Sequence, residues 1–219
     1  MSSVVSECVE PCHASAVFRR LPDPPGRCYL TFDDGPHPES TAAVLQALAA
    51  ARVTASFFVI GRLAREYAPL LRAAHAAGHT IANHGYDHVH PWTLSRARAL
   101  NEIRDGADAL AQAIGTRPEW YRPAHGRLSP YVLEAARSEG QEIALWSRSA
   151  VDWGPLVTPR RILQRLRHVQ AGDIVLLHDG PLRHNRPDCT VRMLPMLLAW
   201  LARHGTGAAA LPRTATMFG

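Results

Sequence analysis

The stretch that decides the fold is YLTFDDGP at residues 29–36, in which a run of strand-forming residues ends in two adjacent carboxylates. Short apolar runs of the same kind recur along the chain and end in polar residues at TIANHGYDH (80–88), WYRPAHG (120–126) and IVLLHD (174–179). Helical patterns separate these runs. Strands that alternate with helices are typical of βαβ units, so the sequence predicts an α/β fold with a mainly parallel sheet.

Apolar periodicity and capping residues predict the individual elements. Strands are expected at residues 28–32, 55–59, 79–82, 120–122, 143–146 and 174–177, and helices at 41–51, 69–77, 94–114, 130–138, 159–169 and 191–204. Ser40 and Thr93 are the expected N-caps of the first and third helices, and Gly115 is expected to end the third. About seven such repeats favour a barrel, complete or incomplete, over an open sheet. In either architecture the chemistry belongs at the carboxyl ends of the strands.

The charge composition excludes several kinds of chemistry. All 24 basic residues are arginines, against 19 acidic residues, which gives a formal net charge of +5. Without a lysine the chain can form neither a Schiff base nor a phosphate-binding P-loop, which excludes pyridoxal phosphate enzymes, Schiff-base aldolases and P-loop nucleotide hydrolases. The excess of arginine is modest and spread out, so no nucleic-acid partner is expected.

The chain of 219 residues is expected to fold as one domain with its own core. A proline-rich segment at 21–26 separates an N-terminal arm, residues 1–26, from the domain at 27–219. The arm has no apolar run long enough for a signal peptide, and no segment reaches the ~20 apolar residues of a membrane helix. We therefore expect a cytoplasmic protein without a membrane span, and the oligomeric state is left open.

The four cysteines are few and irregularly spaced, so no disulfide framework is predicted. Cys8, Cys12 and His13 are close together in the arm and form a second, less favoured metal candidate. The low cysteine content agrees with the cytoplasmic location expected from the arm.

The stronger candidate for a metal site is His84 with His88, because side chains four residues apart can aim at one point. A carboxylate is the natural third ligand and leaves one position open for water, as in catalytic divalent sites. In the pair Asp33-Asp34 one carboxylate would bind the metal, and the other would act as general base beside the cation of Arg122. The alternatives are a common surface turn for the aspartates and a chance spacing for the histidines.

A general acid is predicted at His178, which directly follows an apolar strand. A carboxylate partner such as Asp152 would raise its pKa and keep the imidazole protonated. A core histidine with one hydrogen bond is the alternative. Trp153 and Leu176 are interpreted either as pocket wall or as plain core. Other polar residues near these motifs are interpreted as supporting or surface residues: His37, His90 and Asp179.

Five motifs, in this order, resemble those of the NodB-homology polysaccharide deacetylases, or carbohydrate esterase family four. They are TFDDGP (31–36), NHGYDH (83–88), RPAHG (122–126), DW (152–153) and LLH (176–178), and the resemblance spans residues 27–211. Each motif alone is modest evidence, whereas all five in order are strong evidence.

The resemblance implies a distorted, incomplete (β/α) barrel and hydrolytic removal of N-acetyl groups from amino sugars. The implied catalytic residues are Asp33 as base, Arg122 that orients it, His178 as acid, and Asp152 that tunes the acid. The implied ligands of a divalent metal, usually zinc, are Asp34, His84 and His88. The implied substrate contacts are Pro123, the main-chain N–H of His125 for the oxyanion, and Trp153 and Leu176 around the acetyl methyl group.

Two motifs depart from the family pattern. The third motif is commonly RPPYG, and here Ala124 and His125 replace the proline and the tyrosine. An imidazole therefore stands where a phenol is usual, and it can alter substrate contacts or approach the metal. In the fourth motif Ser149 stands where some members carry a further aspartate. Both departures bear on substrate identity more than on catalysis.

We therefore expect a metal-dependent hydrolase that removes N-acetyl groups from N-acetylglucosamine-containing oligosaccharides or glycoconjugates. Two alternatives stay open: an O-acetyl esterase of the acetylxylan type, and a non-catalytic metal- or glycan-binding protein. An alcohol needs less protonation to leave than an amine, so replacement of His178 would separate amide from ester hydrolysis. Acetate release would separate either enzyme from a binding protein.

Overall fold

The computed structural model describes residues 17–22, 26–182 and 184–214. The strands are β1 (Val17–Phe18), β2 (Arg27–Asp33), β3 (Ser56–Val59), β4 (Thr80–Asn83), β5 (Trp120–Tyr121), β6 (Glu142–Ala144), β7 (Arg148–Ser149), β8 (Ile174–His178) and β9 (Gly207–Ala209). The helices are α1 (Ser40–Ala50), α2 (Gly61–Glu66), α3 (Ala68–Ala76), α4 (Arg96–Ile114), α5 (Pro130–Ser138), α6 (Pro159–Leu166) and α7 (Pro187–Arg203). Two short 3-10 helices, η1 (Pro91–Thr93) and η2 (Ala124–Gly126), follow β4 and β5.

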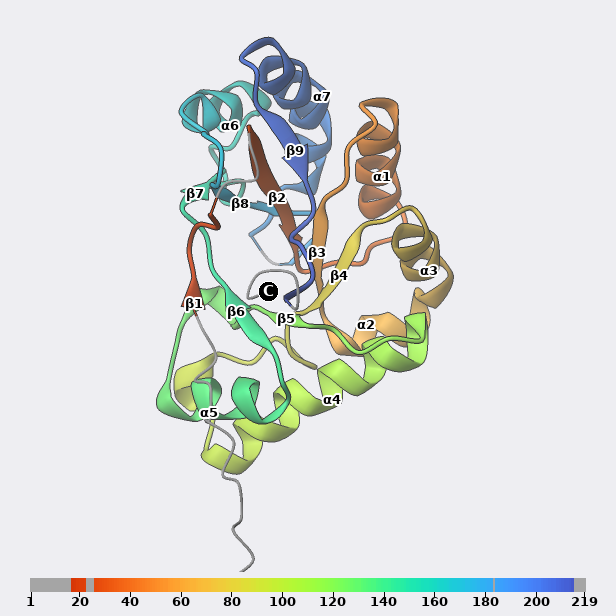
Figure 1. The fold of residues 1–219 in the computed structure, drawn as a ribbon, viewed down its shortest axis with the longest axis vertical. Helices are drawn as coiled ribbons and strands as arrows, with labels where there is room; N and C mark the ends of the chain where they lie inside the picture. Colours follow the sequence, from red (N-terminus) through yellow and green to blue (C-terminus); the bar gives the residue numbers. More distant parts are fainter. Residues whose placement is uncertain (1–16, 23–25, 183, 215–219) are drawn as a thin grey trace, which may run out of the picture.

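The sheet curls into an incomplete barrel with the helices outside it (Figure 1). Its strand order is β1-β6-β5-β4-β3-β2-β8-β7, each neighbouring pair is parallel, and β9 pairs with the start of β2. Among the described residues no ladder joins β1 to β7, so the barrel is open there. The expected distorted, incomplete (β/α) barrel is confirmed, with eight strands in this order where about seven were expected.

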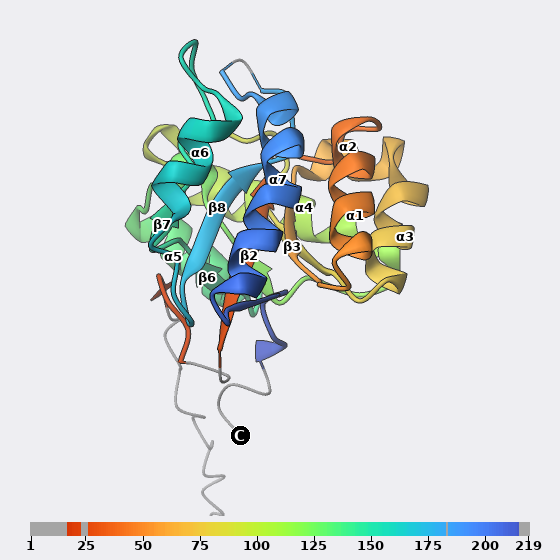
Figure 2. The ribbon, with the colours of Figure 1, turned by 90° about the horizontal axis from the view of Figure 1, so that it is seen from above.

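Strand β2 divides its side chains between the two faces of the sheet, as successive residues of a strand do. Tyr29, Thr31 and Asp33 face the barrel interior, whereas Leu30 and Phe32 pack in the core under the helices. Figure 2 shows α7 in front of β2 and β8, between α6 and α1. Asp33 therefore ends the inward-facing row of β2 at the carboxyl end of the strand.

The opposite end of the barrel is filled with apolar side chains. One residue from each of six strands contributes to this inner cluster: Tyr29, Phe58, Ala82, Trp120, Ala144 and Ile174. The segment after β9 covers it, because the carbonyls of Leu211 and Pro212 accept hydrogen bonds from barrel side chains at 2.8 Å. A ligand site consequently belongs at the other end, where the strands end in polar residues.

The expected strands and helices are all present, with ends shifted by a few residues. The sequence did not predict α2, β1, β7 and β9, which are two to six residues long. The expected N-cap at Thr93 is wrong, since Ser95 caps α4 by accepting a hydrogen bond from the N–H of Arg98. The expected end of this helix at Gly115 is confirmed.

The expected N-cap at Ser40 is also wrong. Ser40 is the first residue of α1, and its hydroxyl donates instead to the carbonyl of Asp179 at 2.6 Å. A contact with a residue distant in the sequence has therefore replaced the local cap. This contact ties the start of α1 to the end of β8.

The described part of the predicted arm, residues 17–22, is attached to the barrel. Val17 and Phe18 pair with β6, and Leu21 is buried. The division of the chain at residue 26 stays a prediction, and the metal candidate of Cys8, Cys12 and His13 lies outside the described residues. None of the described helices is long and apolar enough to cross a membrane.

Candidate active site

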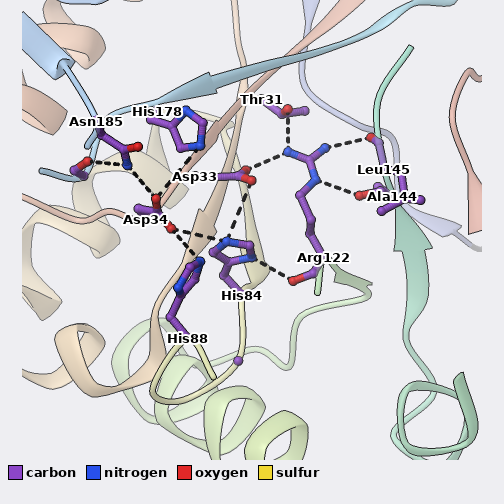
Figure 3. Close-up of polar contacts among 12 residues, drawn as sticks. Thr31, Asp33, Asp34, His84, His88, Arg122, Ala144, Leu145, His178 and Asn185 are labelled. Carbon is purple, nitrogen blue, oxygen red and sulfur yellow. Dashed lines mark hydrogen bonds and ion pairs between the residues drawn. The ribbon is translucent and has the colours of Figure 1, made fainter. Parts of the chain in front are cut away.

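The polar strand ends meet in one pocket of about 620 Å³ at the carboxyl end of the barrel. It is lined by the residues that the sequence assigns to the base, the metal and the acid: Asp33, Asp34, His84, His88 and His178. These side chains come from the ends of β2, β4 and β8 and point toward one another (Figure 3). Arg122 and Asp152 are fully buried and contact the lining residues from behind.

The adjacent carboxylates of Asp33 and Asp34 have different partners. Asp34 adopts a left-handed backbone conformation with φ 72°, which aspartate tolerates better than most residues, so the chain turns sharply after β2. Oδ1 of Asp33 lies 2.6 Å from Nη1 of Arg122, whereas Oδ1 of Asp34 faces His84 and His88. The turn therefore lets two neighbouring carboxylates serve different chemical roles.

Arg122 is the centre of a buried hydrogen-bond network (Figure 3). Its guanidinium donates to the carboxylate of Asp33 at 2.6 Å and to the hydroxyl of Thr31 at 2.8 Å. It also donates to the main-chain carbonyls of Ala144 and Leu145, at 2.7 and 2.9 Å. A planar fork of donors is available from arginine and not from lysine, and it holds the Asp33 carboxylate in one orientation.

Asp34, His84 and His88 form a group that can hold a metal ion, because their ligand atoms all lie within 4.8 Å of one another. Oδ1 of Asp34 lies 3.3 Å from Nε2 of His84 and 3.2 Å from Nε2 of His88. This oxygen is buried and has no hydrogen-bond partner among the described residues. Nδ1 of His84 lies 2.7 Å from the carbonyl of Arg122, which places the proton on Nδ1 and leaves Nε2 for a metal. The group therefore fits a cation.

The protonation of these groups also bears on metal binding. Burial, together with the positive charge of His84, lowers the pKa of His88 to about 3. Burial would raise the pKa of Asp34, but the charges of the surrounding histidines hold that pKa far below its usual range. At His84 burial opposes protonation, but the carboxylates of Asp33 and Asp34 outweigh it and raise the pKa. A metal would therefore compete with a proton mainly at His84.

His178 forms a hydrogen-bonded pair with Asp152. Its Nδ1 lies 2.7 Å from Oδ1 of Asp152, and its main-chain N–H donates to Oδ2, which also accepts a hydrogen bond from Thr190. Burial would lower the pKa of His178, but the carboxylate of Asp152 outweighs it, and the pKa rises to about 9. Nε2 lies 4.0 Å from Oδ2 of Asp34. An imidazolium held in this way can donate a proton into the pocket.

The pocket wall contains Trp153, Leu176 and His125, as the resemblance implies. Trp153 is 38% exposed and stands edge-on to His178, with the ring centroids 5.5 Å apart. Pro123 is buried at the start of η2 and is not among the described lining residues, so its contact with substrate stays a prediction.

His125 stands beside the metal group and not within it. Its ring centroid lies 4.9 Å from that of His88 and 5.3 Å from that of His90. Its backbone is left-handed, with φ 57°, and a Cβ on the following Gly126 would clash with the ring of Trp146. The imidazole that replaces the usual phenol therefore extends a row of rings away from His88.

Sequence reasoning missed Asn185, whose Nδ2 donates to Oδ2 of Asp34 at 2.6 Å. It lies in the loop between β8 and α7, where no motif marks it. Thr31 could have been predicted, because it lies two residues before Asp33 on the same face of β2.

Asp179 was expected to be a supporting or surface residue. It is buried, and its carboxylate accepts a hydrogen bond from the hydroxyl of Thr41. Burial raises its pKa to about 7.

Comparison with known proteins shows which family shares this arrangement. Residues 20–144 match the family model described as polysaccharide deacetylase. The chitooligosaccharide deacetylase of Bradyrhizobium sp. (strain ANU 289) is 35% identical over 194 residues, covering 84% of this chain and 89% of the relative. A peptidoglycan-N-acetylglucosamine deacetylase of Bacillus cereus (strain ATCC 14579) is 32% identical over 178 residues, covering 80% of this chain and 82% of the relative.

A solved structure agrees with these relatives. The crystal structure of a peptidoglycan N-acetylglucosamine deacetylase in complex with an N-hydroxybenzamide compound has a TM-score of 0.85 and 28% identity, and the match covers 93% of each chain. The family model spans more than half of the chain, and the Bradyrhizobium relative is matched over most of its length. This chain therefore belongs to the polysaccharide deacetylase family.

Proposed function

We propose that this deacetylase hydrolyses the N-acetyl groups of N-acetylglucosamine units in oligosaccharides or glycoconjugates, with a divalent metal as cofactor. The observation that carries the proposal is one pocket in which a buried Asp/His/His group lies between two carboxylate–cation pairs, Asp33 with Arg122 and Asp152 with His178. The names of the relatives, which refer to chitooligosaccharide and to peptidoglycan N-acetylglucosamine, support a substrate of this class.

Asp34, His84 and His88 would hold the metal. A divalent cation at this group would polarise the acetyl carbonyl and lower the pKa of a water molecule beside it. One carboxylate with two imidazoles, and a position left open, is a ligand set of catalytic zinc sites, and for that reason we propose zinc. The carbonyl of Arg122 and the amide of Asn185 orient two of the ligands through their other polar atoms.

Asp33 would act as the general base toward the attacking water. Its Oδ1 is bound by Arg122, and its Oδ2 lies 3.8 Å from Nε2 of His84, next to the metal group. The guanidinium therefore fixes one oxygen and leaves the other turned toward the reacting groups. General bases in such positions contribute roughly 10²–10⁴-fold to the rate.

His178 would protonate the nitrogen of the departing amine. An amide cannot readily expel an amide anion, so the reaction needs an acid whose proton is present at neutral pH. The pKa of His178 near 9 meets this need, because Asp152 stabilises the imidazolium. Base and acid line the same pocket, next to the metal group, so the base would take a proton from the attacking water and the acid would give one to the leaving nitrogen.

The pocket wall would receive the acetyl group. Leu176 and Trp153 offer apolar surface to the methyl group, and both line the pocket. The main-chain N–H of His125 is the donor proposed for the oxyanion that forms when water adds to the carbonyl. A main-chain donor is unaffected by the exchange of a phenol for an imidazole at this position.

Acetate release from N-acetylated chito-oligosaccharides by the zinc-loaded protein tests the proposal. Asp33→Asn keeps the size of the side chain but removes the base, so release should fall by roughly 10²–10⁴-fold. Asp87→Asn is a matched control, because Asp87 follows the same strand as the histidine ligands but its side chain is 56% exposed. Substantial release by Asp33→Asn under identical conditions contradicts the assignment of the base. No release from any N- or O-acetylated glycan favours a non-catalytic metal- or glycan-binding protein.

An O-acetyl esterase is the second candidate. The raised pKa of His178 favours amides over esters, because an amine must be protonated to leave and an alcohol leaves more readily. Parallel assays on chito-oligosaccharides and acetylated xylan decide between the two substrates. A higher kcat/KM on acetylated xylan than on chito-oligosaccharides would show that the protein is an O-acetyl esterase and not an N-deacetylase.

A further inference from the structure

An exposed indole lies in η1, in the loop that follows the metal-binding histidines. Trp92 is 66% exposed, although tryptophan has a large apolar surface and is highly buried on average. Its Nε1 nevertheless donates to the carbonyl of Leu128 at 3.1 Å, and its main-chain N–H donates to Nδ1 of His90 at 3.3 Å. The ring is therefore held in one orientation, its polar atom is already bonded, and the accessible surface that remains is aromatic.

Arg127 contacts the same ring. Its guanidinium carbon lies 5.2 Å from the centroid of Trp92, within the range of a cation–π contact. The side chain is exposed, and in the described part of the chain no carboxylate forms an ion pair with it. Its N–H groups are therefore available to acceptors of a ligand that lies on the indole.

A row of rings connects Trp92 with the pocket. His90 stands edge-on to Trp92, with the centroids 5.2 Å apart. His90 also stacks on His125 at 5.3 Å, and His125 contacts the predicted metal ligand His88 at 4.9 Å. Because His125 lines the pocket, the row runs from the pocket wall to the exposed indole.

We propose that Trp92 and Arg127, together with His125 of the pocket wall, form a sugar-binding subsite beside the pocket, which holds a neighbouring pyranose of the chain whose N-acetyl group is being hydrolysed. The inference rests on the proposed function. A pyranose presents a face of C–H bonds that packs on the electron-rich face of an indole. Its hydroxyl and acetyl oxygens accept hydrogen bonds from a guanidinium. A ring that is already fixed loses little conformational entropy when the sugar binds.

The subsite makes a prediction about substrate length. A monosaccharide at the metal group cannot reach Trp92 at the same time, whereas an oligosaccharide can occupy both places. The binding energy gained at the indole therefore favours oligosaccharides over N-acetylglucosamine. The indole lies away from the reacting atoms, so this energy should lower KM more than it changes kcat.

A binding experiment without turnover tests the subsite. Calorimetry would measure the Kd of N-acetylated chitopentaose for zinc-loaded Asp33→Asn protein, with and without a second substitution. Trp92→Ala should weaken Kd on the order of tenfold, and Trp92→Phe should restore most of the affinity because an aromatic face remains. Met196→Ala is the control: Met196 is 43% exposed on α7, and its removal should leave Kd unchanged.

Kinetics separate the subsite from the chemistry. With chitopentaose, Trp92→Ala should raise KM about tenfold and leave kcat nearly unchanged. With an aryl acetate too small to span both places, kcat/KM should not change. If acetate is released and Trp92→Ala alters neither Kd nor KM, the subsite is overturned and the proposed function stands. If chitopentaose binds in a Trp92-dependent way but no acetate is released, the proposed function fails and the subsite stands.

An exposed tryptophan also suits a contact between two protein chains. Sedimentation equilibrium of the unchanged protein and of Trp92→Ala, at the concentrations of the binding assay, addresses this alternative. The subsite requires the same molecular mass for both proteins. A dimer that depends on Trp92, with an unchanged Kd for chitopentaose, would overturn the subsite and assign the indole to self-association.

Discussion

The two carboxylate–cation pairs of the site differ in what holds them. The pair of Asp33 and Arg122 is buried, and the four hydrogen bonds of the guanidinium tie β2 to the end of β6. In the pair of Asp152 and His178 the carboxylate is fully buried, but the imidazole is 12% exposed at the pocket. One cation is permanent and the other can lose its proton. The cation beside the proposed base therefore keeps its charge, whereas the charge of the proposed acid depends on pH.

The backbone that carries the carboxylate also differs between the two pairs. Asp33 ends the regular strand β2, whereas Asp152 follows Val151, which has a φ of 48°. A left-handed conformation is a strained one for a β-branched residue, and such strain is found mostly at functional sites. Strands therefore end in both the proposed base, Asp33 on β2, and the proposed acid, His178 on β8, whereas the carboxylate partner of the acid comes from a strained loop.

Removal of Arg122 should have the largest effect, because this one guanidinium pairs with the Asp33 carboxylate and orients it. Arg122→Ala leaves the Asp33 carboxylate buried without its cation, and we expect a free energy of unfolding lower by about 3–5 kcal/mol. Acetate release should fall by roughly 10³-fold or more. Urea unfolding and acetate assays check both values, and Arg122→Lys keeps a charge if the alanine variant does not fold.

Arg104→Ala is the matched control for this prediction. Its guanidinium is exposed and contacts only its helical neighbours Asn101 and Asp105, so stability and activity should stay nearly unchanged. Full activity in Arg122→Lys would show that charge alone, and not the fork of donors, holds the base.

On the acid side, His178→Ala should reduce amide hydrolysis by roughly 10²–10³-fold and ester hydrolysis by much less. The reason is that only the amine must receive a proton before it leaves. The ratio of the kcat/KM values on an N-acetylated and an O-acetylated substrate, compared between His178→Ala and the unchanged protein, measures this difference. His75→Ala, an exposed histidine on α3, serves as the control. An equal loss on both substrates would contradict the role of His178 as acid.

Asp152→Asn should weaken the acid without removing it. NMR titration of the metal-free protein should find the pKa of His178 near 9, above its ordinary value of 6.5, and the substitution should lower it. Because the folded state holds this proton more tightly than the unfolded chain, the pair stabilises the fold fully below about pH 6.5. This contribution is lost as the pH rises through about 9.

In the Asp152→Asn variant, the rate of amide hydrolysis should begin to fall at a lower alkaline pH than in the unchanged protein. At neutral pH the activity should fall on the order of tenfold. An unchanged titration of His178 in Asp152→Asn would show that the carboxylate of Asp152 does not set its protonation.

The smallest expected effect is on metal affinity. Asn185→Ala removes the hydrogen bond to Oδ2 of Asp34, and we expect zinc to bind roughly tenfold more weakly. Competition with a chelator of known affinity measures the change. Asn101→Ala, on the exposed side of α4, should bind zinc like the unchanged protein. Equal zinc affinity in both variants would mean that Asn185 does not orient the ligand.

The strand ends that build the site could be predicted from the sequence. An apolar run that stops at a polar residue marks the ends of β2, β4, β5 and β8, and parallel strands place such ends at one edge. The short strands β1, β7 and β9 were not predicted, whereas β5, which is equally short, was predicted from the apolar run before its polar motif. The cap at Ser40 was mispredicted because the helix begins at Ser40 itself, and Glu39 occupies the N-cap position.

By itself the sequence determined which residues are candidates for the chemistry. The aspartate pair at 33–34, the spacing of His84 and His88, and an imidazole after an apolar strand are local patterns of residue type. Arg122 and Asp152 were expected beside Asp33 and His178, but the tertiary structure alone decided the further contacts that hold these residues in place. Arg122 and Thr31 are 91 positions apart in the chain, and Asn185 and Asp34 are 151 apart. Contacts over such separations follow from the closure of the barrel and leave no trace in local spacing.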